Sequence, residues 1–318
     1  MENISVLMPV KNGADYLSRA KMFISENILA NDEVIVINDN STDNTLQILS
    51  DWARTDSRVT ILDSESPGLV NALNLGLQHC SNKWVARFDV DDAYSLQRLE
   101  RQRNYISSEK VAIFSDYCVI SENGKSLGKF LSGVTSIGVK LSLLHGRRTA
   151  HPSVLMNLEK VKLAGGYRLS EFPAEDLGLW LRLSSLGEFY SIPETLLFYN
   201  LHTSSVTNSK RNLSIAKRNQ LINDYISQNG KVAITPHDYD DLVATYRKLD
   251  SDFERYLVFC IEVFLGRRNL LVPKRIWLHI LWSLMIGSLN QKGLKAYISI
   301  TQGVILRWRI RQSFSELN

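Results

Sequence analysis

The chain is poor in cysteine. Its three cysteines, Cys80, Cys118 and Cys260, lie far apart and are odd in number. This pattern fits neither a disulfide framework nor the close ligand spacing of a zinc site. We therefore expect no structural disulfide, and a reducing, cytoplasmic setting is the simplest explanation.

Long hydrophobic runs are also absent. The N-terminus has no basic stretch followed by a long apolar segment, so we expect neither a signal peptide nor an N-terminal anchor. Residues 276–289 form an apolar run of fourteen residues that is interrupted by polar ones. A helix that crosses a bilayer needs roughly twenty residues, so this run is too short to span a membrane.

Acidic residues are scarce at the C-terminal end. The net charge of the 318 residues is +4, but residues 267–318 hold nine basic residues and the single acid Glu316. Trp277, Trp282 and Trp308 lie in the same stretch. Basic residues mixed with tryptophan and aliphatics indicate contact with an anionic membrane surface. The alternative is that the apolar stripes pack against the rest of the chain or another subunit. No nucleic-acid-binding motif accompanies the charge, so we expect no nucleic acid partner.

The first hundred residues alternate between two patterns. Short runs rich in β-branched residues are separated by segments in which apolar residues recur at helical spacing. The expected strands are residues 4–8, 34–37, 59–62 and 84–88. This alternation predicts an α/β fold with a doubly wound, mostly parallel central sheet and helices on both faces.

Three polar segments follow these strands. They are residues 9–12, 38–40 and 89–92. Ligands of such sheets bind beyond the carboxyl ends of the strands, so we expect the three segments to line one crevice.

The pattern becomes less regular after residue 110. We expect strands over residues 111–120 and 189–201 and a short helix over 158–164, whereas residues 126–150 give no clear element. Glu175 and Asp176 come at the start of another expected helix. Carboxylates are favoured near a helix N-terminus, so capping alone is one explanation for this pair.

The most informative segment is Arg87-Phe88-Asp89-Val90-Asp91-Asp92, which places three carboxylates directly after an expected strand. Carboxylates this close repel one another unless a cation lies among them. Mg²⁺ and Mn²⁺ prefer such oxygen ligands and often complete their shell with substrate phosphates. The alternative is an acidic surface turn that caps a helix beginning near Ser95. Arg98 lies about one helical turn past the cluster and could meet a phosphate, but we expect it on a solvated helix face.

Several segments together resemble the family 2 glycosyltransferases, inverting enzymes with the A-type glycosyltransferase fold. The resemblance covers roughly residues 3–205. It rests on the order and spacing of SVLMPVKNG at 5–13, VINDNSTDNT at 36–45, GLVNALNLG at 68–76, RFDVDD at 87–92, HPS at 151–153 with GGY at 165–167, and EDLGLWLR at 175–182. The resemblance implies a catalytic domain over residues 1–208, with a nucleotide-binding half (1–120) and an acceptor half (121–208). A helical, basic C-terminal appendage would cover residues 209–318.

The resemblance also implies roles for individual residues. The nucleotide would be bound by Pro9, Val10, Lys11, Asn12, Asp39 and Asp89, with Asp39 on the uracil ring and Asp89 near the ribose and donor sugar. Mn²⁺ or Mg²⁺ would be held by Asp91, with Asp92 and His202, although an ordinary loop histidine is the alternative for His202. Asp176 would be the catalytic base, with Glu175 as its neighbour. For His151 we expect structural packing.

The expected activity is transfer of one sugar from a UDP-sugar to a lipid-carried glycan in surface polysaccharide synthesis, such as O-antigen, capsule or exopolysaccharide. The enzyme would act in the cytoplasm, peripherally on the cell membrane. The Gln-x-x-Arg-Trp element of processive relatives is missing, which favours transfer of a single sugar. Lys11 replaces a frequent aromatic residue, and Asn38 and Asn40 replace the more usual Asp and Gly, which weakens the inference to uracil.

Two alternatives from other classes stay open. A sugar-phosphate nucleotidyltransferase would share the open sheet and the acidic metal site, but it should show a glycine-rich N-terminal loop. A non-catalytic scaffold at the membrane would explain the basic C-terminal stretch, but not the acid cluster and Glu175-Asp176 together.

Overall fold

The computed structural model describes residues 1–131, 135–144, 149–201, 210–230, 232–233 and 270–271. The strands are β1 (Ile4–Val10), β2 (Glu33–Asn38), β3 (Val59–Asp63), β4 (Trp84–Arg87), β5 (Ala93–Tyr94), β6 (Lys110–Ser121), β7 (Ser126–Phe130), β8 (Leu155–Asn157), β9 (Glu188–Leu201), β10 (Val232–Ala233) and β11 (Leu270–Leu271). The α-helices are α1 (Ala14–Asn27), α2 (Thr45–Thr55), α3 (Leu69–His79), α4 (Arg98–Arg103), α5 (Ser136–Leu144), α6 (Leu158–Leu163), α7 (Glu175–Leu183) and α9 (Arg211–Asn229). Two 3₁₀ turns, η1 (His151–Ser153) and η2 (Leu169–Glu171), complete the described elements.

Nine strands form one mixed sheet in the order β3-β2-β1-β4-β8-β6-β9-β5, with β7 paired to β6. The pairs among β3, β2, β1 and β4 are parallel, and β6 and β9 are parallel to each other. Only β5, β7 and β8 run antiparallel to their neighbours. The mostly parallel α/β sheet predicted from the sequence is confirmed.

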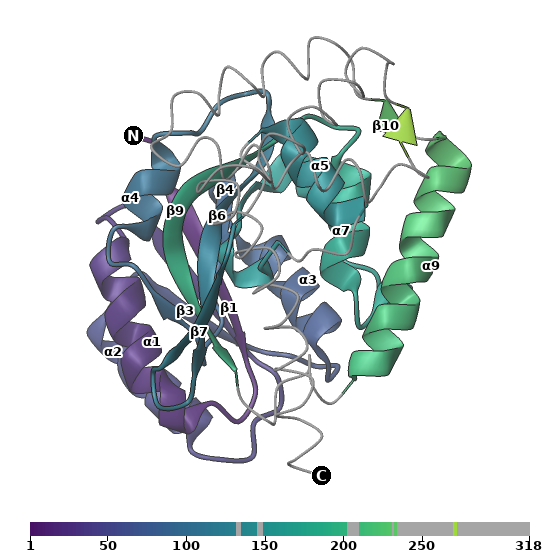
Figure 1. Ribbon diagram of the computed structural model, residues 1–318. Coiled ribbons are helices and arrows are strands. Elements are labelled where there is room, and N and C mark those ends of the chain that lie inside the picture. The colour runs from purple at the N-terminus through teal and green to yellow at the C-terminus, as the bar shows by residue number, and fades with distance from the viewer. Residues whose placement is uncertain (132–134, 145–148, 202–209, 231, 234–269, 272–318) are drawn as a thin grey trace.

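Helices cover both faces of the sheet (Figure 1). Alternation along β1 explains this, because Leu7 belongs to one apolar core whereas Val6 and Met8 belong to the other. Helices α1 and α2 pack on the second core, for example through Leu17 and Trp52. Helices α3, α5 and α7 pack on the first, so the sheet is buried on both faces as parallel sheets require.

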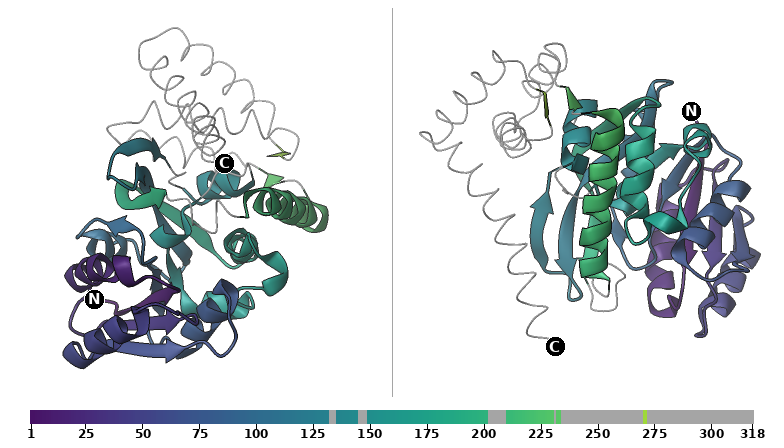
Figure 2. Two further views of the ribbon diagram at one scale, coloured as in Figure 1. Left: turned by 90° about the horizontal axis from the view of Figure 1, so that it is seen from below. Right: turned by 90° about the vertical axis from the view of Figure 1, so that its right-hand side faces the viewer.

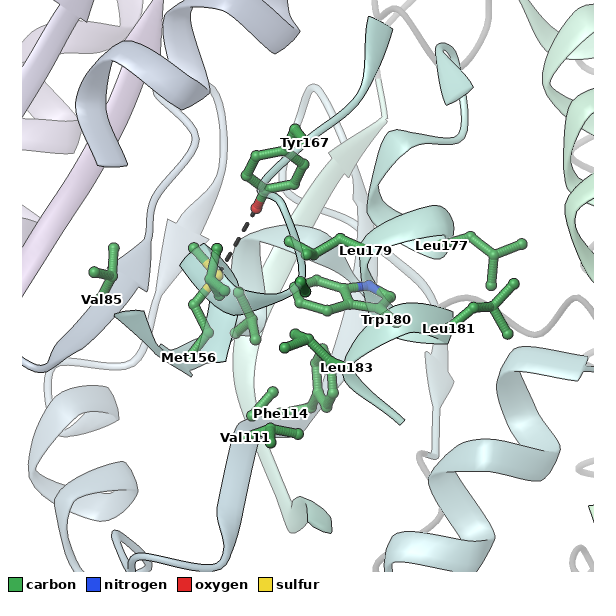
Figure 3. Close-up of a cluster of buried hydrophobic side chains, with 14 of the residues drawn as sticks. Val85, Val111, Phe114, Met156, Tyr167, Leu177, Leu179, Trp180, Leu181 and Leu183 are labelled. Atoms are coloured by element: carbon green, nitrogen blue, oxygen red, sulfur yellow. Dashed lines mark hydrogen bonds between the residues drawn. The ribbon is translucent and has the colours of Figure 1, made fainter. Parts of the chain in front are cut away.

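The first core centres on α7 (Figure 3). Trp180 is fully buried and meets Phe114 of β6 edge to face, with ring centroids 5.2 Å apart. Leu177, Leu181 and Leu183 belong to the same cluster. This packing fixes the helix that begins with the two carboxylates of the EDLGLWLR segment.

Several boundaries differ from the sequence-based expectation. β1 continues to Val10, since its pairing with β2 extends to Val10 and Asn38. β4 ends at Arg87, because the chain turns there into the acidic loop. Within residues 126–150, where the pattern gave no clear element, the structure has β7 and α5.

The predicted C-terminal appendage lies largely outside the described residues. Its first helix, α9, is described and packs against α7 (Figure 2). The basic stretch 267–318 is outside the described residues apart from the two residues of β11. Among the helices that are described, none combines the length and the apolar character needed to span a bilayer.

Candidate active site

The three acids after β4 come together as the sequence predicts. Each of Asp89, Asp91 and Asp92 offers one carboxylate oxygen, and these oxygens all lie within 4.8 Å of one another. The β4 strand delivers the loop to the carboxyl edge of the sheet. The alternative, an acidic surface turn that caps the next helix, does not explain this convergence, because α4 begins only at Arg98.

Asp92 is the most deeply buried of the three, with 2 % of its surface exposed. Its Oδ1 accepts a hydrogen bond from the backbone N–H of Asn200 on β9 at 2.8 Å. Its Oδ2 is buried and has no hydrogen-bond partner among the described residues. Burial, followed by the charges of Asp91 and Asp89, raises the pKa of Asp92 well above its usual range. A divalent cation would satisfy the unpaired oxygen and relieve this repulsion, so the oxygen donor set fits Mg²⁺ or Mn²⁺.

Two buried arginines, Arg87 and Arg98, lie beside the acid cluster. Sequence reasoning assigned no role to Arg87 and favoured a solvated helix face for Arg98. Arg87 Nη2 pairs with Asp89 Oδ1 at 2.5 Å, and the Arg87 side chain is only 4 % exposed. Arg98 is fully buried and stacks on Phe88, with its guanidinium carbon 4.4 Å from the ring centroid. The expectation of a solvated helix face for Arg98 is wrong. Its Nη2 instead donates to the carbonyl of Val154 at 3.1 Å, and burial lowers its pKa to about 10.

The predicted nucleotide-binding segments meet at the ends of β1 and β2. The backbone N–H of Asp39 donates to the carbonyl of Val10 at 2.7 Å. Asp39 Oδ1 accepts from the backbone N–H of Gly68, at the start of α3, at 2.8 Å. Pro9 and Val10 are buried strand residues, whereas Lys11 and Asn12 are exposed.

Glu175 and Asp176 occupy the first turn of α7. Glu175 is buried, and burial together with the charge of Asp176 raises its pKa to about 7. Arg87 lowers and Asp89 raises that pKa, so the Glu175 carboxyl lies within electrostatic range of the acid cluster. Two groups of carboxylates that are distant in the chain therefore share one region.

Asp176 is only partly buried. Its Oδ1 accepts from the backbone N–H of Leu177 at 2.7 Å and lies 4.0 Å from Nη1 of Arg218 on α9. Sequence reasoning missed Arg218 as well, because it lies beyond the segments that carry the family resemblance.

Known proteins resemble this chain in sequence and in fold. Residues 5–145 match the family model described as "Glycosyl transferase family 2". An uncharacterized glycosyltransferase of Haemophilus influenzae is 30 % identical over 250 residues, which cover 72 % of this chain and 77 % of that protein. The chain belongs to glycosyl transferase family 2.

Other similar proteins are more distant. The putative teichuronic acid biosynthesis glycosyltransferase TuaG of Bacillus subtilis is 25 % identical over 65 % of this chain and 82 % of its own length. The crystal structure of S. aureus TarS 1-349 with UDP-GlcNAc superposes with a TM-score of 0.58 at 16 % identity, covering 98 % of this chain and 92 % of that one. The mannosyltransferase PcManGT from Pyrobaculum calidifontis, in complex with GDP-Man and Mn²⁺, gives a TM-score of 0.54 at 16 % identity over 97 % and 88 %. These two structures establish the shared fold.

The structure explains two departures of this chain from the usual family 2 residues. Asn38 Nδ2 donates to Asp63 Oδ1 at 2.7 Å, a contact that an aspartate in its place would turn into repulsion. Asn40 has φ +56°, a left-handed conformation that glycine adopts freely and asparagine tolerates. Asn12 also has positive φ, and its Oδ1 accepts from the backbone N–H of Thr42 at 2.8 Å. These three asparagines shape the loops that follow β1 and β2 in this family 2 chain.

His151 packs as expected. Its Nε2 shares a 2.7 Å hydrogen bond with the hydroxyl of Tyr167, and its ring lies against Trp180 with centroids 5.8 Å apart. Burial and the charge of Arg87 lower the pKa of His151 well below its usual range, so the ring is neutral. The Tyr167 hydroxyl also faces the sulfur of Met156 (Figure 3). His202, predicted as a metal ligand, lies outside the described residues; the last described residue before it is Leu201 of β9.

Proposed function

We propose that this family 2 protein is an inverting, metal-assisted glycosyltransferase that moves one sugar from a UDP-sugar to a lipid-carried glycan during surface polysaccharide synthesis. The family assignment favours this activity over the nucleotidyltransferase and the scaffold. The catalytic unit would comprise residues 1–208, with the basic C-terminal region at an anionic membrane surface on the cytoplasmic side.

One observation carries the proposal. Arg87 pairs directly with Asp89 of the acid cluster, and its charge also acts on Glu175 at the start of α7. The charge of this one buried guanidinium thus acts both on a carboxylate suited to a cation and on one beside the proposed base. An in-line displacement needs this division, because the leaving group and the base are on opposite faces of the reacting carbon.

The metal-binding residues would be Asp91 and Asp92, with His202 as a further ligand. The buried, unpaired Oδ2 of Asp92 supports this assignment. Asp89 would face the ribose and donor sugar, since Arg87 already pairs with its Oδ1. When bound, Mn²⁺ or Mg²⁺ would offset the negative charge of the departing nucleoside diphosphate.

Proton transfer would fall to Asp176. Its Oδ1 is held by the N–H of Leu177, and its Oδ2 would accept the proton of the acceptor hydroxyl. The hydroxyl oxygen then forms a bond to the anomeric carbon while the bond to the diphosphate oxygen breaks and its electron pair leaves with the diphosphate. One displacement inverts the anomeric centre, so a UDP-α-sugar would give a β-linkage. The neighbouring Glu175 would gain or lose its negative charge near neutral pH, because its pKa is about 7.

The similar proteins support the substrate class. TarS has been solved with UDP-GlcNAc, and TuaG is named for teichuronic acid biosynthesis. PcManGT was solved with GDP-Man and Mn²⁺, so GDP-sugars are the alternative class of donor to test. Asp39, with Oδ1 held by Gly68, would present its other oxygen to the N–H of the base.

The test is a donor panel. Purified full-length protein is incubated with UDP-glucose, UDP-galactose, their N-acetyl forms and GDP-mannose, each with Mn²⁺, and release of free nucleotide is measured. We expect slow UDP release from one UDP-sugar, lost in the presence of EDTA and in Asp176→Asn. If only GDP-mannose releases its nucleotide, the donor is a GDP-sugar and not a UDP-sugar. Pyrophosphate-dependent UTP formation would identify a nucleotidyltransferase instead.

A further inference from the structure

Helix α9 runs beside α7, the helix that carries the proposed base (Figures 1 and 2). Side chains of α9 contact both ends of α7. Arg218 of α9 meets Asp176 at the start of α7, and Tyr225 shares a 3.0 Å hydrogen bond with Ser184 just past its end. The two helices are therefore parallel, and α9 is docked in a fixed register.

One face of α9 makes this contact. Ser214, Arg218 and Ile222 recur at four-residue spacing, and all three are buried, at 6, 8 and 7 % exposed. Ile222 belongs to the same apolar core as Trp180 of α7. The neighbouring Lys217 points elsewhere, because its ammonium donates to Gln220 of the same helix at 3.0 Å in an exposed position.

A nearly buried arginine is an uncommon residue to find in a helix contact. Arg218 pairs with the carboxylate of Asp176, with Nη1 and Oδ1 4.0 Å apart. The same Oδ1 accepts from the N–H of Leu177. Oδ1 is thus held from the backbone and from α9, whereas Oδ2 makes no hydrogen bond within the described part of the chain.

We propose that Arg218 is a positioning residue for Asp176: the docked helix α9 holds the Oδ1 side of the carboxylate through this guanidinium, so that Oδ2 faces the acceptor hydroxyl. The inference rests on the proposed function of Asp176 as base. It extends the catalytic unit beyond residue 208, the expected end of the catalytic domain, to the helix that leads into the C-terminal region.

The experiment uses the full chain with five variants. Arg218→Gln removes the charge, Arg218→Lys keeps it, and Lys217→Gln is the matched control one residue away on α9. Asp176→Asn, alone and with Arg218→Gln, completes a double-mutant cycle. Nucleotide release is measured with the donor that the parent protein hydrolyses, and the melting temperature is measured for every variant.

Arg218→Gln should lower kcat at least about 10-fold with the donor KM changed less than about twofold, because a misaligned base affects the chemical step and not donor binding. Arg218→Lys should recover most of the lost rate, and Lys217→Gln should match the parent. In the cycle, Arg218→Gln should lower the melting temperature clearly less in the Asp176→Asn background than in the parent, as coupled residues do.

Additive melting shifts, or an active parent whose kcat is unchanged by Arg218→Gln, would overturn the inference while leaving the proposed function intact. A rate loss that Arg218→Lys does not recover and that parallels the fall in melting temperature would assign Arg218 to structure alone. A parent that hydrolyses no donor would remove the proposed function and this inference with it.

Discussion

At the scale of single residues, Asp92 is held in a position that disfavours its own charge. Its Oδ2 is buried without a partner in the described structure, and the neighbouring acids raise its pKa. When the pKa of a carboxyl is higher in the folded than in the unfolded protein, the folded protein loses stability as the pH rises from the lower pKa to the higher one. At neutral pH the protein without metal therefore carries an energetic penalty at this residue.

Asp92→Asn should remove that penalty and the metal site together. The amide oxygen can still accept from Asn200 N–H, so the metal-free variant should be more stable than the parent by about 1–2 kcal/mol. Mn²⁺ with UDP should raise the melting temperature of the parent but not of the variant. Calorimetric melting in EDTA and in Mn²⁺ with UDP measures both effects, with the exposed Glu159→Gln as the control; a variant stabilised by Mn²⁺ and UDP as much as the parent would contradict the assignment.

Glu175 gives a second residue-scale prediction. Its pKa of about 7 in the folded protein lies above the usual carboxyl value of 4.5, because of burial and Asp176. The folded protein thus holds this proton to higher pH than the unfolded chain, and stability falls as pH rises from about 4.5 to 7. Glu175→Gln should be close to the parent in stability at pH 4.5 and more stable above pH 7, by on the order of 3 kcal/mol at most.

Urea unfolding of both proteins across pH 4–8 measures this difference. A difference that stays constant over the range would show that Glu175 does not titrate there. Metal is left out of these samples, so that the acid cluster stays the same in parent and variant.

At the scale of elements, α7 is tied to the turn after α6 by one arginine. Arg182 Nε donates to the carbonyl of Ala164 at 2.9 Å, Nη2 to that of Gly166 at 2.5 Å, and Nη1 pairs with Glu171. Three acceptors on two separate segments match the planar fork of a guanidinium, which a single ammonium cannot reproduce.

Arg182→Lys should therefore destabilise the protein by about 2 kcal/mol, because at least one buried acceptor is left unpaired. Arg168→Lys is the matched control, since Arg168 is 54 % exposed and lies 4.0 Å from the same Glu171. It should change stability by less than about 0.5 kcal/mol. Equal losses in the two variants by urea unfolding would show that the fork contributes nothing beyond its charge.

Elements also differ in how far the sequence predicts them. The parallel strands β1 to β4 are long enough to show a β-branched run, so their order and their ligand-binding ends follow from the pattern. β5 has two residues and β8 has three, which is too short for any periodic signal. The insertion of β8 between β4 and β6 depends on pairing across a long stretch of chain, which local propensity does not encode.

At the scale of the whole molecule, the acids of the site were predictable because carboxylates at strand ends have a chemical meaning on their own. Their counter-charges were not. Arg87, Arg98 and Arg218 are buried, against the usual preference of arginine for the surface, and this burial comes from the tertiary packing. The reacting groups are therefore easier to predict from the sequence than the groups that hold them in place.

The charge of the whole chain is asymmetric, and this leads to the last prediction. The nine basic residues of residues 267–318 should attract the protein to anionic lipid, at about 1 kcal/mol for each lysine or arginine near the surface. Replacing Lys274 and Arg275 together by glutamine should lower the partition coefficient onto vesicles of anionic lipid roughly 30-fold in low salt.

Sedimentation with vesicles measures this partition. Lys217→Gln removes a charge outside the basic stretch and should have little effect, and vesicles of neutral lipid should bind parent and variant alike. Raising the ionic strength should weaken parent binding, because exposed charges are screened within about 8 Å at physiological salt. Binding that is insensitive to both salt and the double substitution would mean that apolar packing, and not the basic charge, governs where residues 267–318 lie.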